Sequence, residues 1–140
     1  MQLQKAVLDA LYLFNQSPDH RLYTLVEFNH YCVFPIIHSK ARLFYEKDKP
    51  IGLVTWGWFT DKEAQDFLDE RWCPDESVYQ RKQSDQLWGI EFIAPYSPPL
   101  KFIKQMMKET YQVSTQHLDI DHKVNWRRLA SPDQLHTRRL

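Results

Sequence analysis

Two short stretches of the chain carry side chains suited to acid–base chemistry. The first, NQSPDHRLY (residues 15–23), places His20 three residues after Ser17, and the second, LWGIEFIAPY (87–96), places Glu91 inside an apolar run. A histidine titrates near neutral pH and can accept a proton from a reacting group. A carboxylate in apolar surroundings is costly to bury without a partner. Glu91 therefore faces solvent, pairs with an arginine, or binds a histidine and fixes its tautomer.

The segment around His20 also has a purely structural explanation. Ser17 could cap a helix, with Pro18 in the first helical position and Asp19 near the helix start. His20 would then be a polar residue in a turn. Ser17 could instead hydrogen-bond within a site, and the local sequence leaves both alternatives open.

Other catalytic chemistries have less support. The six histidines and two cysteines form no compact ligand pattern such as HExxH or paired CxxC, so we expect no metal site. His117, Asp119 and Asp121 would share one strand face, where an exposed polar surface is the common outcome. Three glycines are too few for a glycine-rich phosphate loop, so we expect no nucleotide to be bound through one. Cys32, within HYCVFPII, is expected to be a buried, inert thiol.

Composition indicates one globular domain over residues 1–140. The chain is 43% hydrophobic and 14% aromatic, and its net charge of zero argues against an unspecific nucleic-acid binder. Residues 61–76 hold seven acids and two bases, whereas residues 123–140 hold five bases and one acid, so we expect a basic tail that could dock an acidic protein. The absence of a ~20-residue apolar window, a disulfide framework and a leader pattern predicts a soluble, cytoplasmic protein.

The elements that would position the two candidate residues follow from periodicity. Apolar residues at helical spacing predict a helix over residues 3–14. TLVE has the form of a capping box, so a second helix begins at Thr24, with Glu27 reaching back, and Pro35 should end or disturb it. A β-hairpin is expected from Ala41–Glu46 and Ile51–Phe59 around a turn at 47–50.

The remainder of the chain predicts a further helix after Thr60 and a third, central strand in QLWGIEFIAPY. A helix should follow Ser97 and two prolines. Its inward residues are expected to be Leu100, Ile103, Met107 and Tyr111. The alternation in STQHLDIDH (114–122) predicts another strand. These elements make a mixed α/β domain around one sheet.

Four motifs, taken in order, resemble a known enzyme family. SPDHR, VFPII, KPIGLVTW and LWGIEFIAP are similar to segments of the RTX-toxin-activating lysine acyltransferases, the haemolysin-activating acyltransferases. The similarity runs from about Leu8 to Tyr111. Members of that family move a fatty acyl chain from acyl-carrier protein to internal lysines of a protoxin. Their fold resembles the GNAT acyltransferases, a mixed, twisted sheet flanked by helices, and the resemblance also implies a homodimer.

Carried over by position, the family's catalytic histidine falls on His20 and its motif serine on Ser17. The family's catalytic aspartate falls on Glu91, which is one methylene longer. The resemblance implies acyl-carrier protein as donor, no bound cofactor and an RTX-type protoxin as acceptor. Two rivals stay open: a non-catalytic module that binds the carrier or toxin, and an acyltransferase for a different amine.

Two further sets of residues are candidates for binding. An acyl chain needs an apolar groove, although residues suited to line one could equally form plain core. The groove candidates are Trp56, Trp58, Trp88 and Phe92. A basic surface could receive the acidic carrier protein. Its candidates are Lys101, Lys104 and Lys108, together with the basic C-terminal segment.

Overall fold

A five-stranded mixed sheet forms the centre of the molecule. The computed structural model describes residues 2–116, 124–128 and 131–138. The strand order is β1-β2-β3-β4-β5, and all neighbours are antiparallel except the parallel pair β3–β4. The strands are β1 (Ala41–Glu46), β2 (Lys49–Phe59), β3 (Gln86–Ile93), β4 (Val124–Arg128) and β5 (Ser131–Arg138). The prediction of a mixed α/β fold is confirmed, and its GNAT-like topology stays a prediction.

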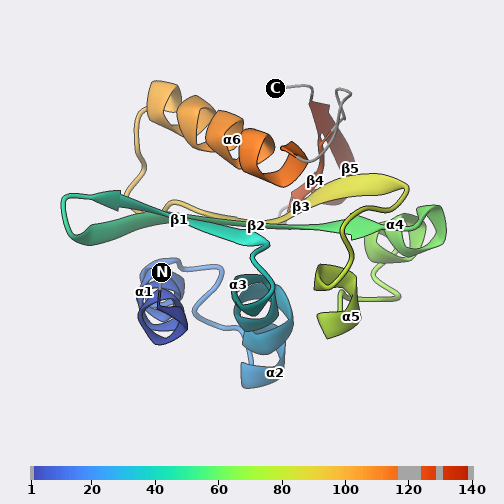
Figure 1. Ribbon diagram of the computed structural model, residues 1–140, viewed down its shortest axis with the longest axis horizontal. Helices are drawn as coiled ribbons and strands as arrows, with labels where there is room; N and C mark the ends of the chain where they lie inside the picture. Colours follow the sequence, from blue (N-terminus) through green and yellow to red (C-terminus); the bar gives the residue numbers. More distant parts are fainter. Residues whose placement is uncertain (1, 117–123, 129–130, 139–140) are drawn as a thin grey trace.

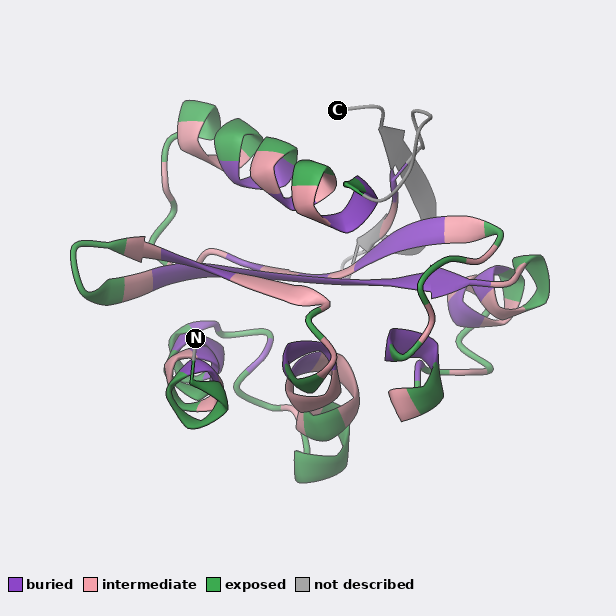
Figure 2. Ribbon diagram, viewed as in Figure 1, coloured by how far each residue is buried: buried purple, intermediate pink, exposed green. Residues whose placement is uncertain are grey.

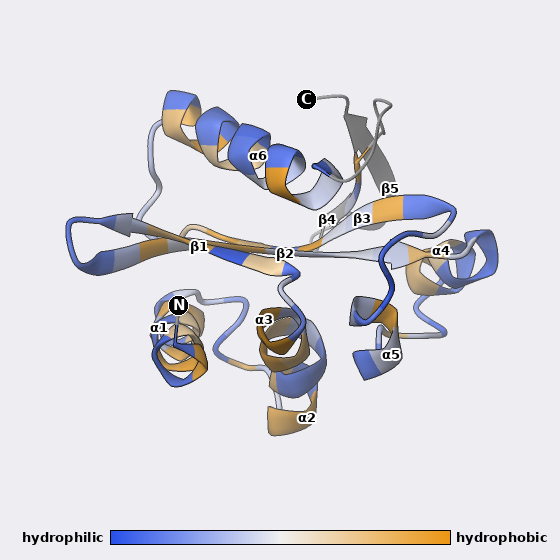
Figure 3. Cartoon of the chain, in the orientation of Figure 1, coloured by the Kyte–Doolittle hydropathy of each residue, from blue (hydrophilic) through white to orange (hydrophobic). Residues whose placement is uncertain are grey.

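Helices cover both faces of the sheet. One face carries α6 (Leu100–Thr115); the other carries α1 (Leu3–Gln16), α2 (Leu25–Phe28), α3 (Phe34–Ile37) and α5 (Glu76–Tyr79) (Figure 1). A π-helical turn, η1 (Asn29–Val33), joins α2 to α3, and α4 (Asp61–Leu68) packs with α5 at the end of β2. The strands between the two layers are largely buried, while the outer sides of the helices are exposed (Figure 2). The outer side of α6 is mostly hydrophilic, whereas α1 and α2 also expose apolar side chains such as Leu8, Leu25 and Val26 (Figure 3). Both layers are therefore amphipathic elements packed on one sheet.

Several predicted elements are confirmed with their local signals. Thr24 and Glu27 form the expected capping box at the start of α2, and the hairpin β1–β2 and the central strand β3 lie where the sequence predicts them. Pro35 does not end the second helix, because the chain stays helical to Ile37. It does disturb that helix: the π-helical turn η1 immediately precedes α3, which has Pro35 in its first turn.

Other expectations are corrected. Leu100 is 65% exposed rather than inward, because α6 turns Met106, Met107 and Thr110 to the sheet. Ser114 and Thr115 belong to α6 and not to a strand, and the rest of that predicted strand lies outside the described residues, except Gln116, which follows the helix.

The C-terminal segment also differs from the expected basic tail. It contains β4, which pairs with the central strand β3, and β5, which pairs with β4 and forms one edge of the sheet. The short helix α5 was not predicted either. A four-residue helix offers too little periodicity to be recognised, and VNWRR has only two alternating apolar residues, Val124 and Trp126, which is too short a pattern to predict a strand.

The described part of the chain contains neither a membrane-spanning helix nor a cluster of metal ligands. None of the helices in the described ranges is long and apolar enough to span a bilayer. Among the same residues, no three His, Cys, Asp or Glu side chains cluster as metal ligands would. The predicted polar face of His117, Asp119 and Asp121 lies outside the described residues.

Candidate active site

His20 lies in a tight turn between α1 and α2. The helix α1 ends at Gln16, and residues 18–22 form turns, so no helix begins at Pro18. The backbone carbonyl of Ser17 accepts from the N–H groups of His20 (3.1 Å) and Arg21 (3.0 Å). The interpretation of Ser17 as a helix N-cap is therefore wrong. The turn instead places the Ser17 and His20 side chains next to each other.

A hydrogen-bonded chain joins the three residues that the sequence singled out. The Ser17 hydroxyl oxygen lies 2.6 Å from Nδ1 of His20, and Nε2 of His20 lies 2.8 Å from Oε2 of Glu91. The three residues are only 8%, 6% and 4% exposed. Residues 71 positions apart in the chain thus share one buried polar cluster.

The hydrogen bonds assign the two ring nitrogens different roles. An ionised carboxylate only accepts hydrogen bonds, so Nε2 carries the ring hydrogen and donates a hydrogen bond to Glu91. Nδ1 then keeps its lone pair and accepts from the Ser17 hydroxyl. The basic nitrogen of His20 faces Ser17, while Glu91 fixes the tautomer and can stabilise the imidazolium.

Tyr23 is a further member of this cluster that the sequence did not reveal. Its hydroxyl donates to Oε1 of Glu91 at 2.6 Å, and its ring centroid lies 5.3 Å from that of His20. Burial, and then the charge of Glu91, raise the pKa of the Tyr23 phenol far above its usual range, so the phenol keeps its proton as a donor. Phe14 packs edge-on against both rings. Nothing in the type or spacing of Tyr23 linked it to a residue in β3.

Glu91 reaches His20 because β3 carries a β-bulge. Thr55 of β2 pairs with Glu91, but the next residue, Trp56, pairs with Gly89, so Ile90 is an extra residue in β3. The Thr55 hydroxyl also accepts from the backbone N–H of Glu91 at 3.1 Å. The bulge and its anchor fix the strand at this point.

The bulge determines which face of the sheet Glu91 occupies. Leu87 packs on the α6 side with Val124, and strict alternation would send Glu91 to the same side. With one residue inserted, Glu91 points to the layer of α1 and α2, where His20 lies. Bulges commonly re-aim a side chain in this way next to active sites.

Comparison with known proteins bears on what this cluster does. A model of the RTX toxin acyltransferase family matches residues 1–134. The chain belongs to the RTX toxin acyltransferase family. It is therefore an acyltransferase that activates RTX toxins. A search of the curated proteins finds no significant match.

The predicted acyl-groove residues do not come together in this RTX toxin acyltransferase. Trp56 and Trp58 pack in one buried cluster on the α6 side, whereas Trp88 packs in another with α4 and α5. Phe92 is half-buried in a third cluster, beside Trp126. Trp88 lies on the opposite face of the sheet from Trp56, Trp58 and Phe92, so within the described residues the four side chains do not line one groove.

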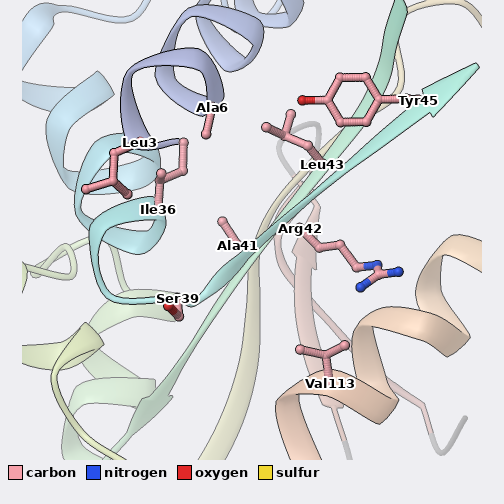
Figure 4. A pocket seen from close by; sticks show the side chains of 9 residues that line it. All are labelled: Leu3, Ala6, Ile36, Ser39, Ala41, Arg42, Leu43, Tyr45 and Val113. Atoms are coloured by element: carbon pink, nitrogen blue, oxygen red, sulfur yellow. The ribbon is translucent and has the colours of Figure 1, made fainter. Parts of the chain in front are cut away.

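A cavity of about 490 Å³ lies along β1, one of the two edge strands of the sheet (Figure 4). Its lining is mainly apolar and comes from both helical layers. It consists of Leu3, Ala6, Ile36, Ser39, Ala41, Arg42, Leu43, Tyr45 and Val113. On the α6 side, Arg42 forms an ion pair with Glu109 at 3.2 Å, and its buried Nε has no hydrogen-bond partner.

The cavity and the polar cluster border the same apolar layer. Ala6, Ile36 and Leu43 belong to a core cluster that also contains Phe14, the residue packed on His20. Ala6 and Phe14 are eight residues apart on α1, a rise of about 12 Å. Cys32 lies fully buried in this cluster, and burial followed by the charge of Glu91 raises the pKa of its thiol, as expected for an inert cysteine.

Proposed function

We propose that the protein moves a fatty acyl group from acyl-carrier protein to lysine side chains of an RTX-type protoxin, with His20 as general base and Glu91 as its orienting carboxylate. The buried Ser17–His20–Glu91 chain is the observation that carries this proposal. The family assignment supports the acyl transfer and the toxin acceptor. We propose the acyl donor, the lysine target and the roles of His20 and Glu91 in addition.

The chemistry requires a base because the acceptor amine is protonated. A lysine has a reference pKa of about 10.4 and an imidazole about 6.5. The ammonium first loses one proton to solvent. As the neutral amine nitrogen attacks the thioester carbonyl carbon, a second proton passes by way of Ser17 to Nδ1 of His20. The imidazolium returns this proton to the carrier thiolate as the C–S bond breaks and the amide forms. General-base help of this kind contributes about 10²–10⁴ in rate.

Ser17 stands in the path of that proton. Its hydroxyl occupies the lone pair of Nδ1, so the amine reaches the base through Ser17. In our mechanism the hydroxyl accepts the amine proton while it gives its own to Nδ1. The same 2.6 Å contact would also suit a serine that carries the acyl group transiently. The mass of the enzyme itself separates the two routes.

The cavity along β1 is our candidate for the acyl chain. Its volume and apolar lining with a few polar groups are those of small-molecule sites. It borders the apolar layer that contains Phe14, the residue packed on His20, and Ala6 on its wall lies about 12 Å along α1 from Phe14, within the length of a fatty acyl chain.

The carrier protein is proposed to dock on α6. Lys101, Lys104 and Lys108 are exposed on one face of this helix and would attract an acidic carrier in a salt-dependent manner. Helix α6 lies across the sheet from α1 and α2, the helices on either side of His20 in the chain (Figure 1). The cavity joins the two sides, because Arg42 and Val113 line it near α6 and Ala6 lines it near α1. Such a donor places the reaction in the cytoplasm.

Intact mass spectrometry tests the proposal. Wild type, His20→Ala and the control His38→Ala are incubated with acyl-carrier protein and a lysine-bearing protoxin fragment. His38 pairs with Glu76 and has no role in the site. We expect acyl mass on the fragment with wild type and His38→Ala, and almost none with His20→Ala.

The remaining outcomes separate the rivals. Full transfer by folded His20→Ala contradicts the assignment of the base. Carrier binding without thioester loss in the wild type indicates a binding module, and acyl mass on the enzyme indicates a Ser17 intermediate. Acylation of small amines but not of the fragment indicates a different acceptor.

A further inference from the structure

A second cleft lies beside the polar cluster, on the side of α4 and α5. It measures about 400 Å³ and is lined by Tyr31, Glu70, Arg71, Trp72 and Cys73. Tyr31 belongs to η1, and the other four residues belong to the segment between α4 and α5. The volume falls within the range of sites that hold a side chain or small ligand.

The wall of this cleft touches the candidate active site. The Tyr31 ring centroid lies 5.8 Å from that of Tyr23, whose hydroxyl donates to Glu91. The backbone carbonyl of Tyr31 also accepts from the Thr55 hydroxyl, at 3.3 Å, and Thr55 in turn accepts from the backbone N–H of Glu91. Two aromatic side chains, Tyr31 and Tyr23, therefore lie between a group held in the cleft and the carboxylate of Glu91.

The segment that forms the cleft is the most acidic part of the chain. Residues 61–76 hold seven acids and two bases. Three of these acids already have charged or titratable partners within the described structure. They are Glu63 with Arg81, Asp66 with Lys62, and Glu76 with His38. The exposed carboxylates of Asp69, Glu70 and Asp75 outnumber the exposed Arg71, so the field around the cleft attracts cations.

Glu70 is the carboxylate best placed to act on a ligand. It lines the cleft, and no hydrogen bond or ion pair of its side chain is found among the described residues. Its backbone has φ 58°, in the left-handed region, and its N–H donates to the Phe67 carbonyl at 3.2 Å. A non-glycine residue at positive φ costs free energy that the fold must offset. The turn therefore holds Glu70 at the cleft in one backbone conformation.

The remaining walls suit a long cationic side chain. Tyr31 and Trp72 both pack against the cluster of Phe59 and Trp88 and are half-buried, so their rings are held in place. An ammonium near an aromatic face gains cation–π attraction, and the methylene stem of a lysine packs well on rings. The two rings and the carboxylate of Glu70 should together bind a lysine side chain more tightly than they bind a neutral side chain.

We propose that this cleft binds a lysine of the basic segment of the protein acceptor and so docks that segment beside the polar cluster. The inference rests on the proposed function, because it supplies the acceptor side of that reaction. The acyl chain then lies along β1, whereas the acceptor docks on the side of Tyr31.

Cys73 provides a test that does not need acyl transfer. Its thiol is exposed in the cleft, whereas Cys32 is fully buried, so iodoacetamide should label Cys73 selectively. The probe is an acetylated, amidated peptide with one lysine flanked by arginines, and its twin has norleucine in place of the lysine. The rate of labelling is measured with increasing peptide, at low and high salt, in wild type and His20→Ala.

We expect the lysine peptide to protect Cys73 more strongly than its twin, and less at high salt. Glu70→Gln should raise the half-protecting concentration about two- to fivefold, as expected for one exposed charge contact. Asp48→Asn, which removes an exposed acid from the β1–β2 turn, should leave it unchanged. In the transfer assay, Glu70→Gln should raise the KM for acceptor by a similar factor with kcat unchanged.

Equal protection by both peptides, or no effect of Glu70→Gln on protection, overturns the inference. Such a result together with normal transfer rejects the cleft and leaves the acyltransferase mechanism standing. Lysine-dependent protection without transfer to any acceptor supports the cleft and rejects the mechanism.

Discussion

Shortening Glu91 by one methylene tests whether the site depends on the length of this side chain. Glu91→Asp keeps the charge and installs the residue that the family resemblance implies. It withdraws the carboxylate by about 1.5 Å, the length of a C–C bond. The distances of 2.8 Å to His20 and 2.6 Å to Tyr23 then grow to about 4 Å, beyond hydrogen-bonding range.

The structure sets the size of the expected effect. A hydrogen bond to a charged group contributes about 1.5–3 kcal/mol, and the two bonds share one carboxylate, so their losses do not add fully. We expect the free energy of unfolding to fall by about 2–4 kcal/mol. Displacing a catalytic group by about 1 Å can cost roughly 10²-fold in rate, so kcat/KM should fall by about that factor.

The measurement is kcat/KM for acyl transfer, followed by intact mass, together with thermal unfolding of the same samples. Glu91→Gln is the matched control, because it keeps the reach and removes the charge. It should leave weak activity with a smaller loss of stability. If Glu91→Asp stays within threefold of wild type and unfolds at the same temperature, the backbone adjusts freely and the argument from side-chain length is refuted.

Three further changes have definite expected outcomes. Ser17→Ala leaves the buried Nδ1 of His20 without its partner, so transfer should fall about tenfold or more and the free energy of unfolding by about 1–3 kcal/mol; unchanged transfer by the folded variant would contradict the role of Ser17 in the proton path. Arg81 lowers the pKa of Glu63 below 4.5, so this pair stabilises the fold above that pH and the contribution is lost as pH falls through the lowered pKa. Glu63→Gln should therefore be less stable than wild type at pH 7 and converge with it as the pH falls below the lowered pKa, in denaturant titrations; a constant difference would contradict this. A Cβ at Gly89 would overlap the Trp126 ring, so Gly89→Ala should lower stability by about 1–3 kcal/mol, and an unchanged melting temperature would show that β4 does not pack there as described.

The elements that the sequence predicted well are those with short-range causes. The capping box at Thr24 and the helical spacing of α1 involve residues within a few positions of one another. The hairpin β1–β2 likewise depends on a local turn. The C-terminal strands were missed because β4 is stabilised by pairing with β3, more than thirty residues earlier, and its own sequence resembles a polar tail.

Some features of the candidate site could likewise be predicted from the sequence, whereas others depended on the tertiary structure. Residue type and the resemblance were enough to single out Ser17, His20 and Glu91, because an imidazole and a carboxylate in apolar surroundings already require partners. The role of Ser17, the membership of Tyr23 and the dispersal of the tryptophans depended on tertiary structure.

The face on which Glu91 lies shows the physical reason most directly. Alternation along β3 alone would place Glu91 under α6, across the sheet from His20. A single inserted residue, Ile90, reverses that direction. The insertion is defined only by the register between β2 and β3, strands brought together by folding. The sequence thus determined which groups can do the chemistry, and strand pairing decided that they meet.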